Sequence, residues 1–262
     1  MGVLDRFRLD GRVAIVTGAS RGIGGAIALA LAEAGADVAL VGRELATLEE
    51  QAHRVEGLGR RALPIELDVA QVERLPAMVE RTLGHFGRLD VLATMAGTVV
   101  RKPILEATPE EFDRVMAVNL RAVYFASQAA ARAMIAERER DPGRPRAKIV
   151  HIASLTSQIA LPNIATYGTS RTAVVGLTRA MAVEWRDHVS VNALAPGYVR
   201  TRQTEALFED PAWVGRTLGK IPMARFCELD DVVGFAVLLA SSASDYMTGQ
   251  VLYLDGGWLA AG

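Results

Sequence analysis

Residues 17–24 read Thr17-Gly18-Ala19-Ser20-Arg21-Gly22-Ile23-Gly24 and lie between an apolar run, residues 13–17, and a helical pattern that begins at Gly22. Glycines at such a place let the chain turn tightly and let backbone N–H groups approach a phosphate at the positive end of the helix. The glycines are spaced GxxxGxG instead of the commoner GxGxxG, and a purely structural turn is the alternative explanation. Because the loop follows a strand and opens a helix, we interpret it as a binding site for the pyrophosphate of a dinucleotide.

The rest of the chain repeats this alternation of strand and helix. Short apolar runs, most of them without alternating polar residues, predict parallel strands covered on both faces. These runs are residues 13–17, 37–42, 62–67, 89–94, 148–153, 189–194 and 250–254. Helical patterns between them include residues 22–34, 44–57, 110–137, 166–187 and 228–241. No strong linker divides the chain, so we predict a single α/β domain with right-handed crossovers.

The overall composition is that of an ordinary globular protein. The 262 residues include 29 basic and 30 acidic side chains, and half of all residues are hydrophobic. This content is too apolar for a disordered chain. The net charge of −1 argues against a dedicated nucleic-acid binder, because such proteins usually carry a basic excess.

The sequence also predicts a cytoplasmic protein that does not enter the membrane. Its single cysteine, Cys227, excludes an internal disulfide and has no nucleophile signature around it, so packing in the interior is its expected role. The first twelve residues have scattered charges and no apolar core of a signal peptide. Residues 149–170 contain no Asp, Glu, Lys or Arg, but His151, Pro162 and Asn163 argue against a transmembrane helix there.

Several further motifs follow the glycine loop in order. They are Asp68-Val69 after the third predicted strand, Ala96-Gly97 after the fourth, Asn119 in a Val-Asn-Leu run, Ser154 thirteen residues before Tyr167, Pro196-Gly197 before Thr201, and Asp255-Gly256-Gly257. In this order they resemble the short-chain dehydrogenase/reductase family over nearly the whole chain. The resemblance implies a single-domain Rossmann fold with a seven-stranded parallel sheet in the order 3-2-1-4-5-6-7, flanked by helices.

The resemblance also implies where a nicotinamide cofactor binds. Asp68 is expected to bond the adenine, and the segment from Pro196 to Thr201 is expected to hold the nicotinamide carboxamide. The complete set of expected cofactor residues is Gly18, Ser20, Arg21, Gly22, Ile23, Gly24, Arg43, Asp68, Val69, Ala96, Gly97, Tyr167, Arg171, Pro196, Gly197, Val199 and Thr201.

The residues after the second predicted strand bear on the choice between NAD and NADP. An acidic residue at this strand end would bond the ribose 2′-hydroxyl and repel a 2′-phosphate. Gly42 stands there, Arg43 follows it, and Arg21 is expected nearby. Two guanidinium groups suit a phosphate, so we predict NADP(H). The alternative is NAD, with both arginines simply solvated.

Hydride transfer between an alcohol carbon and a nicotinamide requires a proton to leave or return to the alcohol oxygen. Tyrosine does this near neutral pH only where a nearby positive charge stabilises its ionised form. By the resemblance, Tyr167 is the acid/base, Ser154 orients the substrate and Asn119 supports a water in a proton relay. The alternative is that Ser154 and Tyr167 only end a strand and begin a helix.

Two positions depart from the family pattern. Arg171 stands where the family has lysine, four residues after Tyr167 and therefore on the same helical face. Its charge can stabilise a tyrosinate and its donors can bond the nicotinamide ribose, but a guanidinium does not give up a proton, so we predict an altered or slower enzyme. Met95 replaces an asparagine before Ala96 and makes no strong hydrogen bonds, which predicts a less rigid strand end beside the cofactor.

The substrate is the least readable part of the sequence. The chain resembles the sugar-acid and polyol branch, such as gluconate 5-dehydrogenases, in residues 101–103, 182–185 and 251–258. Arg101 and Lys102 are candidates to meet a carboxylate, with a solvated charge pair as the alternative. Gln158 and Asn163 are candidates to bond substrate hydroxyls, and residues 202–223 stand where the family has a mobile substrate lid. Steroids, 3-oxoacyl thioesters and other bulky ketones remain open as substrates.

The leading prediction is therefore an NADP(H)-dependent oxidoreductase acting on a secondary alcohol or ketone of a small molecule, without a metal, nucleic-acid or membrane partner. The alternative is a dinucleotide-binding protein that has lost efficient turnover and acts as a sensor or assembly partner, as Arg171 and Met95 suggest. A lyase or epimerase on the same fold has no supporting feature. A homotetramer formed through helices 110–137 and 166–187 and the last strand is expected by resemblance alone.

Overall fold

A computed structural model describes residues 2–261 of the protein. A seven-stranded sheet lies at the centre of the molecule. Its strands are β1 Val13–Thr17, β2 Asp37–Gly42, β3 Ala62–Glu66, β4 Val91–Thr94, β5 Ala147–Ile152, β6 Val189–Pro196 and β7 Val251–Leu254. All neighbours are parallel, and the order is β3-β2-β1-β4-β5-β6-β7. This confirms the predicted sheet and its strand order.

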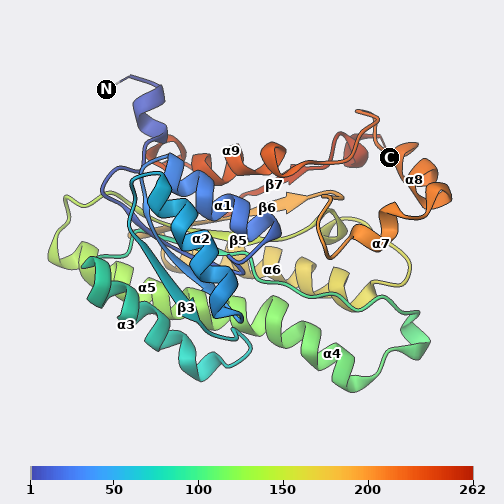
Figure 1. Ribbon diagram of the computed structural model, residues 1–262, viewed down its shortest axis with the longest axis horizontal. Helices are drawn as coiled ribbons and strands as arrows, with labels where there is room; N and C mark the ends of the chain where they lie inside the picture. The colour runs from blue at the N-terminus through green and yellow to red at the C-terminus, as the bar shows by residue number, and fades with distance from the viewer. Residues whose placement is uncertain (1, 262) are drawn as a thin grey trace.

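Helices cover both faces of this sheet (Figure 1). One layer contains α1 Gly22–Glu33, α2 Leu45–Gly57 and α9 Leu229–Ala240. The opposite layer contains α3 Leu75–Phe86, α5 Ala122–Arg140 and α6 Ala165–Glu184, with α4 Pro109–Met116 leading into α5. The short helices α7 Glu205–Phe208 and α8 Pro211–Leu218 lie together at one end of the molecule, away from β3.

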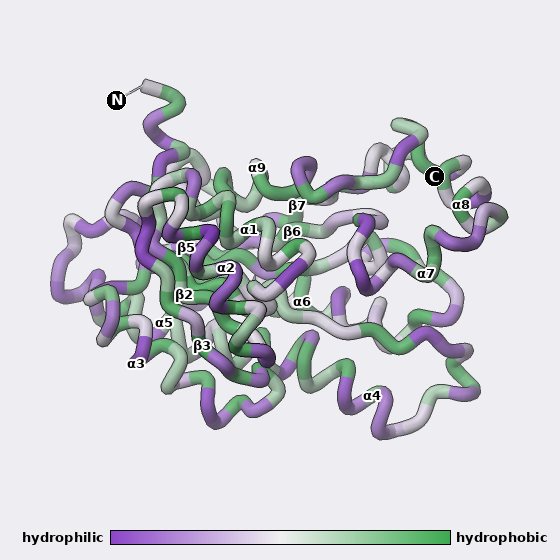
Figure 2. The backbone as a smooth tube through the Cα atoms, in the orientation of Figure 1, coloured by the Kyte–Doolittle hydropathy of each residue, from purple (hydrophilic) through white to green (hydrophobic). Residues whose placement is uncertain are grey.

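The strands are apolar on both faces because each face has its own core. Along β1, Val13 and Ile15 pack among α3, α5 and α6, whereas Ala14 and Val16 pack among α1, α2 and α9. Every residue of β1 is buried. Figure 2 shows the strands as a hydrophobic centre beneath more hydrophilic helices and loops. This two-sided burial is the physical reason for the uninterrupted apolar runs in the sequence.

The prediction of one uninterrupted helix over residues 110–137 was wrong in one respect. A π-helical turn, Ala117–Arg121, separates α4 from α5, and the buried Asn119 lies within it. Apolar periodicity does not reveal such a turn, because the turn depends on what Asn119 binds elsewhere in the fold. Helix α3 was not among the helices predicted, although its buried residues, Leu75, Met78, Val79, Thr82 and Phe86, follow helical spacing.

The uncharged stretch 149–170 folds as most of β5, the turn after it and the start of α6. Within residues 2–261, no helix combines the length and the hydrophobicity needed to cross a membrane.

Candidate active site

The carboxyl ends of β1 and β4 form the switch point of the sheet. These strands are neighbours, but the chain continues from β1 to β2 on one side and from β4 to β5 on the other. In an open parallel sheet this divergence leaves a crevice outside the strand ends, where ligands bind. The loops after β1, β4, β5 and β6 carry most of the predicted site residues, so the topology places them at one edge.

The glycine loop after β1 packs closely against the end of β4. Gly18 has a positive φ of 67°, and a Cβ at this position would lie 2.8 Å from the backbone of Ala96. A Cβ at Gly24 would collide with the carbonyl oxygen of Gly18. Gly22 also has a positive φ, of 57°, and lies beside the side chain of Thr201 after β6. The loop therefore requires its glycines and joins the two halves of the crevice.

The N-terminus of α1 is open to an anion. Arg21 occupies the N-cap position, its side chain does not cap the first N–H groups of the helix, and no acidic residue stands in the first turn. The first N–H groups of a helix have no partner inside the helix, and they favour a negative group. These residues therefore fit the pyrophosphate of a dinucleotide, as the glycine spacing predicts.

The two arginines predicted to meet a 2′-phosphate have different surroundings. Arg43 lines a cavity of about 260 Å³ together with Asp68 at the ends of β2 and β3. The Nη2 atom of Arg21 lies instead 2.9 Å from Oε2 of Glu44. Both side chains of this ion pair are largely exposed, so it adds little to the stability of the fold. It nevertheless compensates the charge of Arg21.

Asn119 connects three segments of the site with its side-chain amide. Its Oδ1 accepts a hydrogen bond from the backbone N of Thr98 at 2.8 Å, and its Nδ2 donates to the Thr98 carbonyl at 2.9 Å. The same Nδ2 donates to Oγ of Ser170 at 3.1 Å, and Ser170 donates to the carbonyl of Tyr167 at 2.7 Å. Both amide hydrogens are thus engaged, so the side chain holds the loop after β4 to α6.

Ser154 begins the short turn after β5. Its hydroxyl accepts a hydrogen bond from the backbone N of Thr156 at 3.2 Å, while its own N donates to Oγ of Ser157 at 3.4 Å. The residue is 8% exposed. These bonds hold the hydroxyl oxygen in place and leave its proton available to bond a substrate oxygen.

Arg171 lies under Tyr167 in the interior of the site. Its guanidinium carbon is 5.2 Å from the centroid of the Tyr167 ring, and its Nη1 donates to the carbonyl of Ile152 at 2.9 Å. A Cβ at Gly97 would collide with the same guanidinium. Arg171 is 3% exposed, and among the described residues its Nε has no hydrogen-bond partner. A fixed positive charge therefore lies beside the tyrosine, in contact with the ends of β4 and β5.

The end of β4 contains the second departure from the family pattern. Met95 is buried in the core shared with α1, and a Cβ at Gly24 would lie 3.2 Å from Cβ of Met95. The neighbouring Thr94 hydroxyl is buried without a partner in the described part of the chain. Van der Waals packing thus takes the place of hydrogen bonding beneath the glycine loop.

The four predicted substrate contacts differ in what they already bind. Lys102 forms an ion pair with Glu111, with 2.7 Å between Nζ and Oε1, so it is not a free cation. Arg101 is exposed, and within residues 2–261 it has no acidic partner. Gln158 donates from Nε2 to the hydroxyl of Tyr253 at 2.9 Å, which leaves its Oε1 as an acceptor. The carbonyl of Asn163, which has a φ of 65°, accepts from the Lys102 backbone at 2.8 Å.

Tyr198 belongs to the site although it was not predicted. Burial raises its pKa, the positive charge of Arg101 opposes this shift, and Tyr167 adds to it, so the three side chains lie near one another. The Tyr198 ring centroid is 4.9 Å from that of Trp213 and 6.0 Å from that of Trp258. Its place directly after Pro196-Gly197 is the signal that would have found it.

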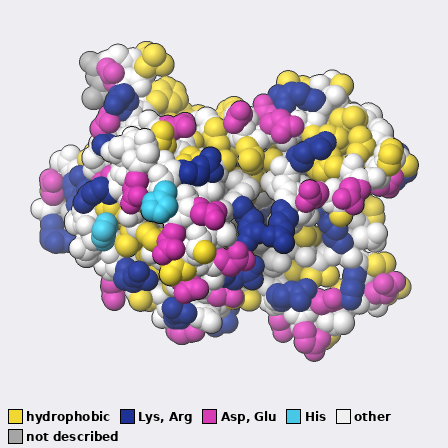
Figure 3. Space-filling model, viewed as in Figure 1, with side chains coloured by type: hydrophobic (Ala, Val, Ile, Leu, Met, Phe, Trp, Pro, Cys, Tyr) yellow, Lys and Arg dark blue, Asp and Glu magenta, His cyan; other side chains and the backbone are white. Residues whose placement is uncertain are grey.

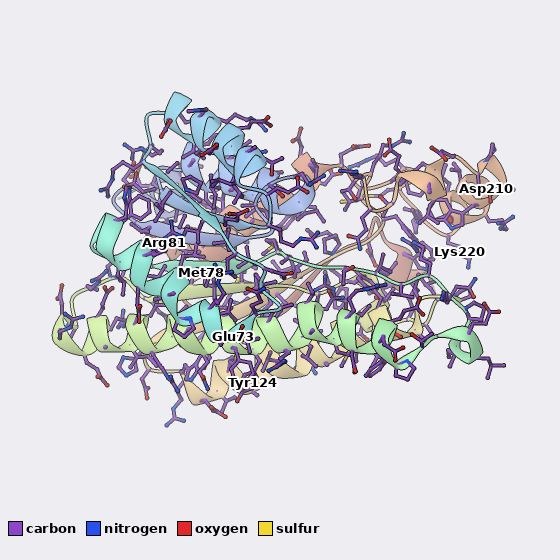
Figure 4. The ribbon with its side chains drawn as sticks, turned by 60° about the horizontal axis from the view of Figure 1, so that its bottom comes forward. Glu73, Met78, Arg81, Tyr124, Asp210 and Lys220 are labelled. Atoms are coloured by element: carbon purple, nitrogen blue, oxygen red, sulfur yellow. The ribbon has the colours of Figure 1, made fainter. Side chains whose placement is uncertain are left out.

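Residues 202–223, predicted as a lid, contain α7 and α8. Trp213 of α8 packs against Phe208 at 5.6 Å and stacks on Phe226 at 5.8 Å between ring centroids. Figure 4 labels Asp210 and Lys220, which flank α8. The Lys220 ammonium lies 5.7 Å from the centroid of the Trp258 ring. Aromatic contacts therefore connect this segment to the floor of the crevice.

Cys227 lies half-buried at the base of this segment. Burial raises the pKa of its thiol to about 11, so the thiol is protonated near neutral pH. A protonated thiol is a poor nucleophile, which agrees with a packing role.

Comparison with known proteins gives concordant matches over nearly the whole chain. The sequence family described as Enoyl-(Acyl carrier protein) reductase matches residues 18–259. The chain is 40% identical to the 2-dehydro-3-deoxy-D-gluconate 5-dehydrogenase of Escherichia coli K12, covering 98% of this chain and 99% of that protein. It is 39% identical to the gluconate 5-dehydrogenase of Gluconobacter oxydans, covering 97% and 96%.

Among solved structures, a gluconate 5-dehydrogenase from Burkholderia cenocepacia in complex with NADP and tartrate is similar with a TM-score of 0.93. The two sequences are 37% identical, and the match covers 99% of each chain. A gluconate 5-dehydrogenase-like protein from Beutenbergia cavernae with bound NADP is 42% identical, with a TM-score of 0.90 over 97% of this chain and 99% of that one.

Proposed function

Because the chain belongs to the short-chain dehydrogenase/reductase family, we propose that it is an NADP(H)-dependent oxidoreductase that interconverts a secondary alcohol and a ketone of a sugar acid. The observation that carries the proposal is the placement of Tyr167 directly over the Arg171 charge, at the strand edge that holds Ser154. The sugar-acid substrates named for the relatives support the choice of substrate class.

The nicotinamide cofactor, when bound, supplies or accepts the hydride. The open N-terminus of α1 and the loop from Gly18 to Gly24 bind its pyrophosphate, as their geometry supports. Arg43 and Asp68 bind the adenosine half in their shared cavity. Thr201, which lies beside Gly22, binds the nicotinamide half.

Tyr167 exchanges the proton of the reacting oxygen, and Ser154 donates a hydrogen bond to that oxygen. The guanidinium of Arg171 supplies a positive charge 5.2 Å from the centroid of the Tyr167 ring. Because guanidinium keeps its protons, Arg171 acts as a fixed charge and does not relay a proton. Asn119 acts as a positioning residue, since its side chain holds Thr98 and Ser170.

The substrate binds on the side of the crevice that faces residues 202–223, which we propose as its lid. Arg101 provides a cation for a carboxylate, because Lys102 is engaged by Glu111. The carbonyl oxygen of Gln158, which its bond to Tyr253 leaves unused, accepts from a substrate hydroxyl, and the side chain of Asn163 is the second proposed partner of the hydroxyl groups.

Turnover assays with defined substrates test this proposal. The protein with NADPH should reduce 5-keto-D-gluconate, and with NADP it should oxidise D-gluconate or 2-dehydro-3-deoxy-D-gluconate. It should act much more slowly on a 3-oxoacyl thioester or a steroid ketone. The Tyr167→Phe variant should lose activity while still binding NADPH. Tight NADPH binding without turnover of any substrate would support the sensor or assembly alternative instead.

We also propose a cytoplasmic homotetramer packed through α5 and α6. Tyr124 and Phe125 of α5 are exposed, and a cavity of about 210 Å³ lies between α5 and α6 beside Tyr124. Figure 4 labels Tyr124 on the outer side of α5. Exposed aromatic side chains on paired helices favour burial against another copy. Sedimentation of Tyr124→Arg should give smaller particles than sedimentation of the parent.

A further inference from the structure

The cavity at the ends of β2 and β3 is lined by two arginines that come from different segments. Its lining residues are Arg43, Glu66, Leu67, Asp68, Gln71 and Arg74. Arg43 follows β2, whereas Arg74 ends the short turn that leads into α3. The backbone joins the two segments, because the N of Leu67 donates to the carbonyl of Gly42 at 2.7 Å.

Arg74 is held in a defined position by its neighbour. Its Nη1 donates to Oε1 of Gln71 at 2.8 Å, and Gln71 lines the same cavity. In residues 2–261, neither Arg43 nor Arg74 has a carboxylate oxygen within ion-pair distance. Two guanidinium groups without an ion-pair partner therefore line one cavity, together with the carboxylates of Glu66 and Asp68.

The carboxylates in the same lining point to a ligand with two kinds of group. Asp68 accepts from the backbone N of Ala70 at 3.0 Å through one oxygen, and its other oxygen has no partner in the described residues. A carboxylate can accept from an exocyclic amine, and paired guanidinium groups bind a phosphate. An adenosine that carries a phosphate on its ribose offers both groups.

We propose that Arg74 is a specificity-determining residue that holds the 2′-phosphate of NADP(H) together with Arg43, and that Arg21, paired with Glu44, contributes less than either. The inference rests on the proposed function, since it concerns the cofactor of that reaction. Glu44 pairs with Arg21 and partly compensates its charge, whereas Arg43 and Arg74 have no ion-pair partner in the described residues. Figure 3 shows Lys and Arg side chains gathered near the middle of the face drawn, with acidic side chains beside them.

The arrangement predicts discrimination between the two cofactors. With NADPH, the phosphate compensates both guanidinium charges. With NADH, no phosphate meets the two guanidinium groups, so they add little to the binding of the adenosine ribose. Removal of the Arg74 guanidinium should therefore weaken the binding of NADPH and leave the binding of NADH almost unchanged.

Isothermal titration calorimetry on the full-length protein tests this without any turnover. For Arg74→Gln, the Kd of NADPH should rise roughly ten- to hundredfold, as expected for the loss of a hydrogen-bonded charge pair. The Kd of NADH should change less than about twofold. The Kd of adenosine 2′-monophosphate should rise as that of NADPH does, and the Kd of adenosine 5′-monophosphate should stay nearly unchanged, as that of NADH does. The dependence of NADPH binding on salt should also become shallower.

Matched variants separate the three arginines. Arg81→Gln removes an exposed arginine further along α3, beyond the cavity, and should leave the Kd of each cofactor unchanged. Figure 4 labels Arg81 and also Glu73, the neighbour of Arg74. Arg43→Gln should raise the Kd of NADPH about as much as Arg74→Gln does. Arg21→Gln should change the Kd of NADPH less than about threefold. Arg74→Lys should restore part of the affinity because it restores the charge. Thermal unfolding should confirm that each variant folds as the parent does.

The outcomes distinguish this inference from the proposed function. If the parent binds NADPH and Arg74→Gln binds it equally tightly, the role of Arg74 is wrong while the proposed function stands. If Arg21→Gln loses as much affinity as Arg43→Gln, the role given to Glu44 is wrong. A parent that binds neither NADPH nor NADH overturns the proposed function and the inference together.

Discussion

The guanidinium carbon of Arg171 lies 5.2 Å from the ring centroid of Tyr167, and the same guanidinium donates to the Ile152 carbonyl at 2.9 Å. A single side chain thus places a permanent charge beside the proposed acid/base and binds the end of β5 to α6. What it does not provide is a proton that can leave, so its role is electrostatic and structural.

Arg171→Lys tests whether the lost proton exchange limits turnover. We expect kcat to rise roughly tenfold, because general acid–base steps of this kind contribute large factors to the rate. The KM for NADPH should change little. Steady-state kinetics across pH 6–9 provides the measurement, with Arg171→Met as the variant that removes the charge and should lose activity. A lower kcat in the lysine variant would show that the site is built around the guanidinium.

Trp213→Leu tests the proposed lid. Trp213 contacts Tyr198, Phe208 and Phe226 through its ring, and each aromatic pair contributes about 0.5–1.5 kcal/mol beyond area burial. The variant should raise the KM of the sugar acid several-fold and leave the Kd of NADPH unchanged. Phe235→Leu, at a partly exposed aromatic on α9, is the control. Equal effects of both substitutions on KM would argue against a lid.

His151 makes the fold sensitive to acid. It is fully buried between Ser127 and Thr178, at 2.9 Å from each hydroxyl oxygen, and burial lowers its pKa to about 3. Since Thr178 donates its own proton to the carbonyl of Val174, Nδ1 of the imidazole must carry the proton given to Thr178. The ring is therefore neutral, with Nε2 as an acceptor from Ser127.

The pH dependence follows from that lowered pKa. The unfolded chain binds a proton at His151 below about pH 6.5, whereas the folded chain does not until about pH 3. The neutral ring therefore makes its full contribution to the free energy of unfolding above pH 6.5. This contribution, of a few kcal/mol in all, is lost as the pH falls toward 3. Urea unfolding of His151→Asn should show lower stability at pH 7 but a shallower fall between pH 6.5 and 4. His53→Asn, at an exposed histidine, should keep the slope of the parent.

Thr94→Val should stabilise the protein. The Thr94 hydroxyl is buried without a partner in the described residues, and an isosteric apolar side chain removes this desolvation cost. We expect a gain of about 1 kcal/mol in the free energy of unfolding, or about 2–4 °C in Tm. Thr178→Val is the matched control and should destabilise, because its hydroxyl bonds both His151 and Val174. A lower Tm for Thr94→Val would mean that the hydroxyl has a partner.

Much of the fold was accessible from the sequence because its signals are local. Uninterrupted apolar runs mark strands buried on both faces, as the opposite cores around Val13 and Ala14 illustrate. The glycines of residues 18–24 also carry local information, because a positive φ at Gly18 and Gly22 is a property of the residue itself. Gly35 likewise predicts the end of α1, and it has a φ of 114°.

The sequence by itself thus determined the parallel strands and the glycine loop, since these depend on periodicity and on spacing within one segment. The series Ser154, Tyr167 and Arg171 was predicted from its resemblance to the family. Only the tertiary structure decided that Arg21 forms an ion pair with Glu44 and that Lys102 forms one with Glu111. It also decided that Asn119 lies in a π-helical turn and accepts a hydrogen bond from the backbone N of Thr98. The physical reason is that ion pairs and hydrogen bonds act over a few ångströms. Their partners come from whichever segments the packing brings together, however far apart they stand along the chain.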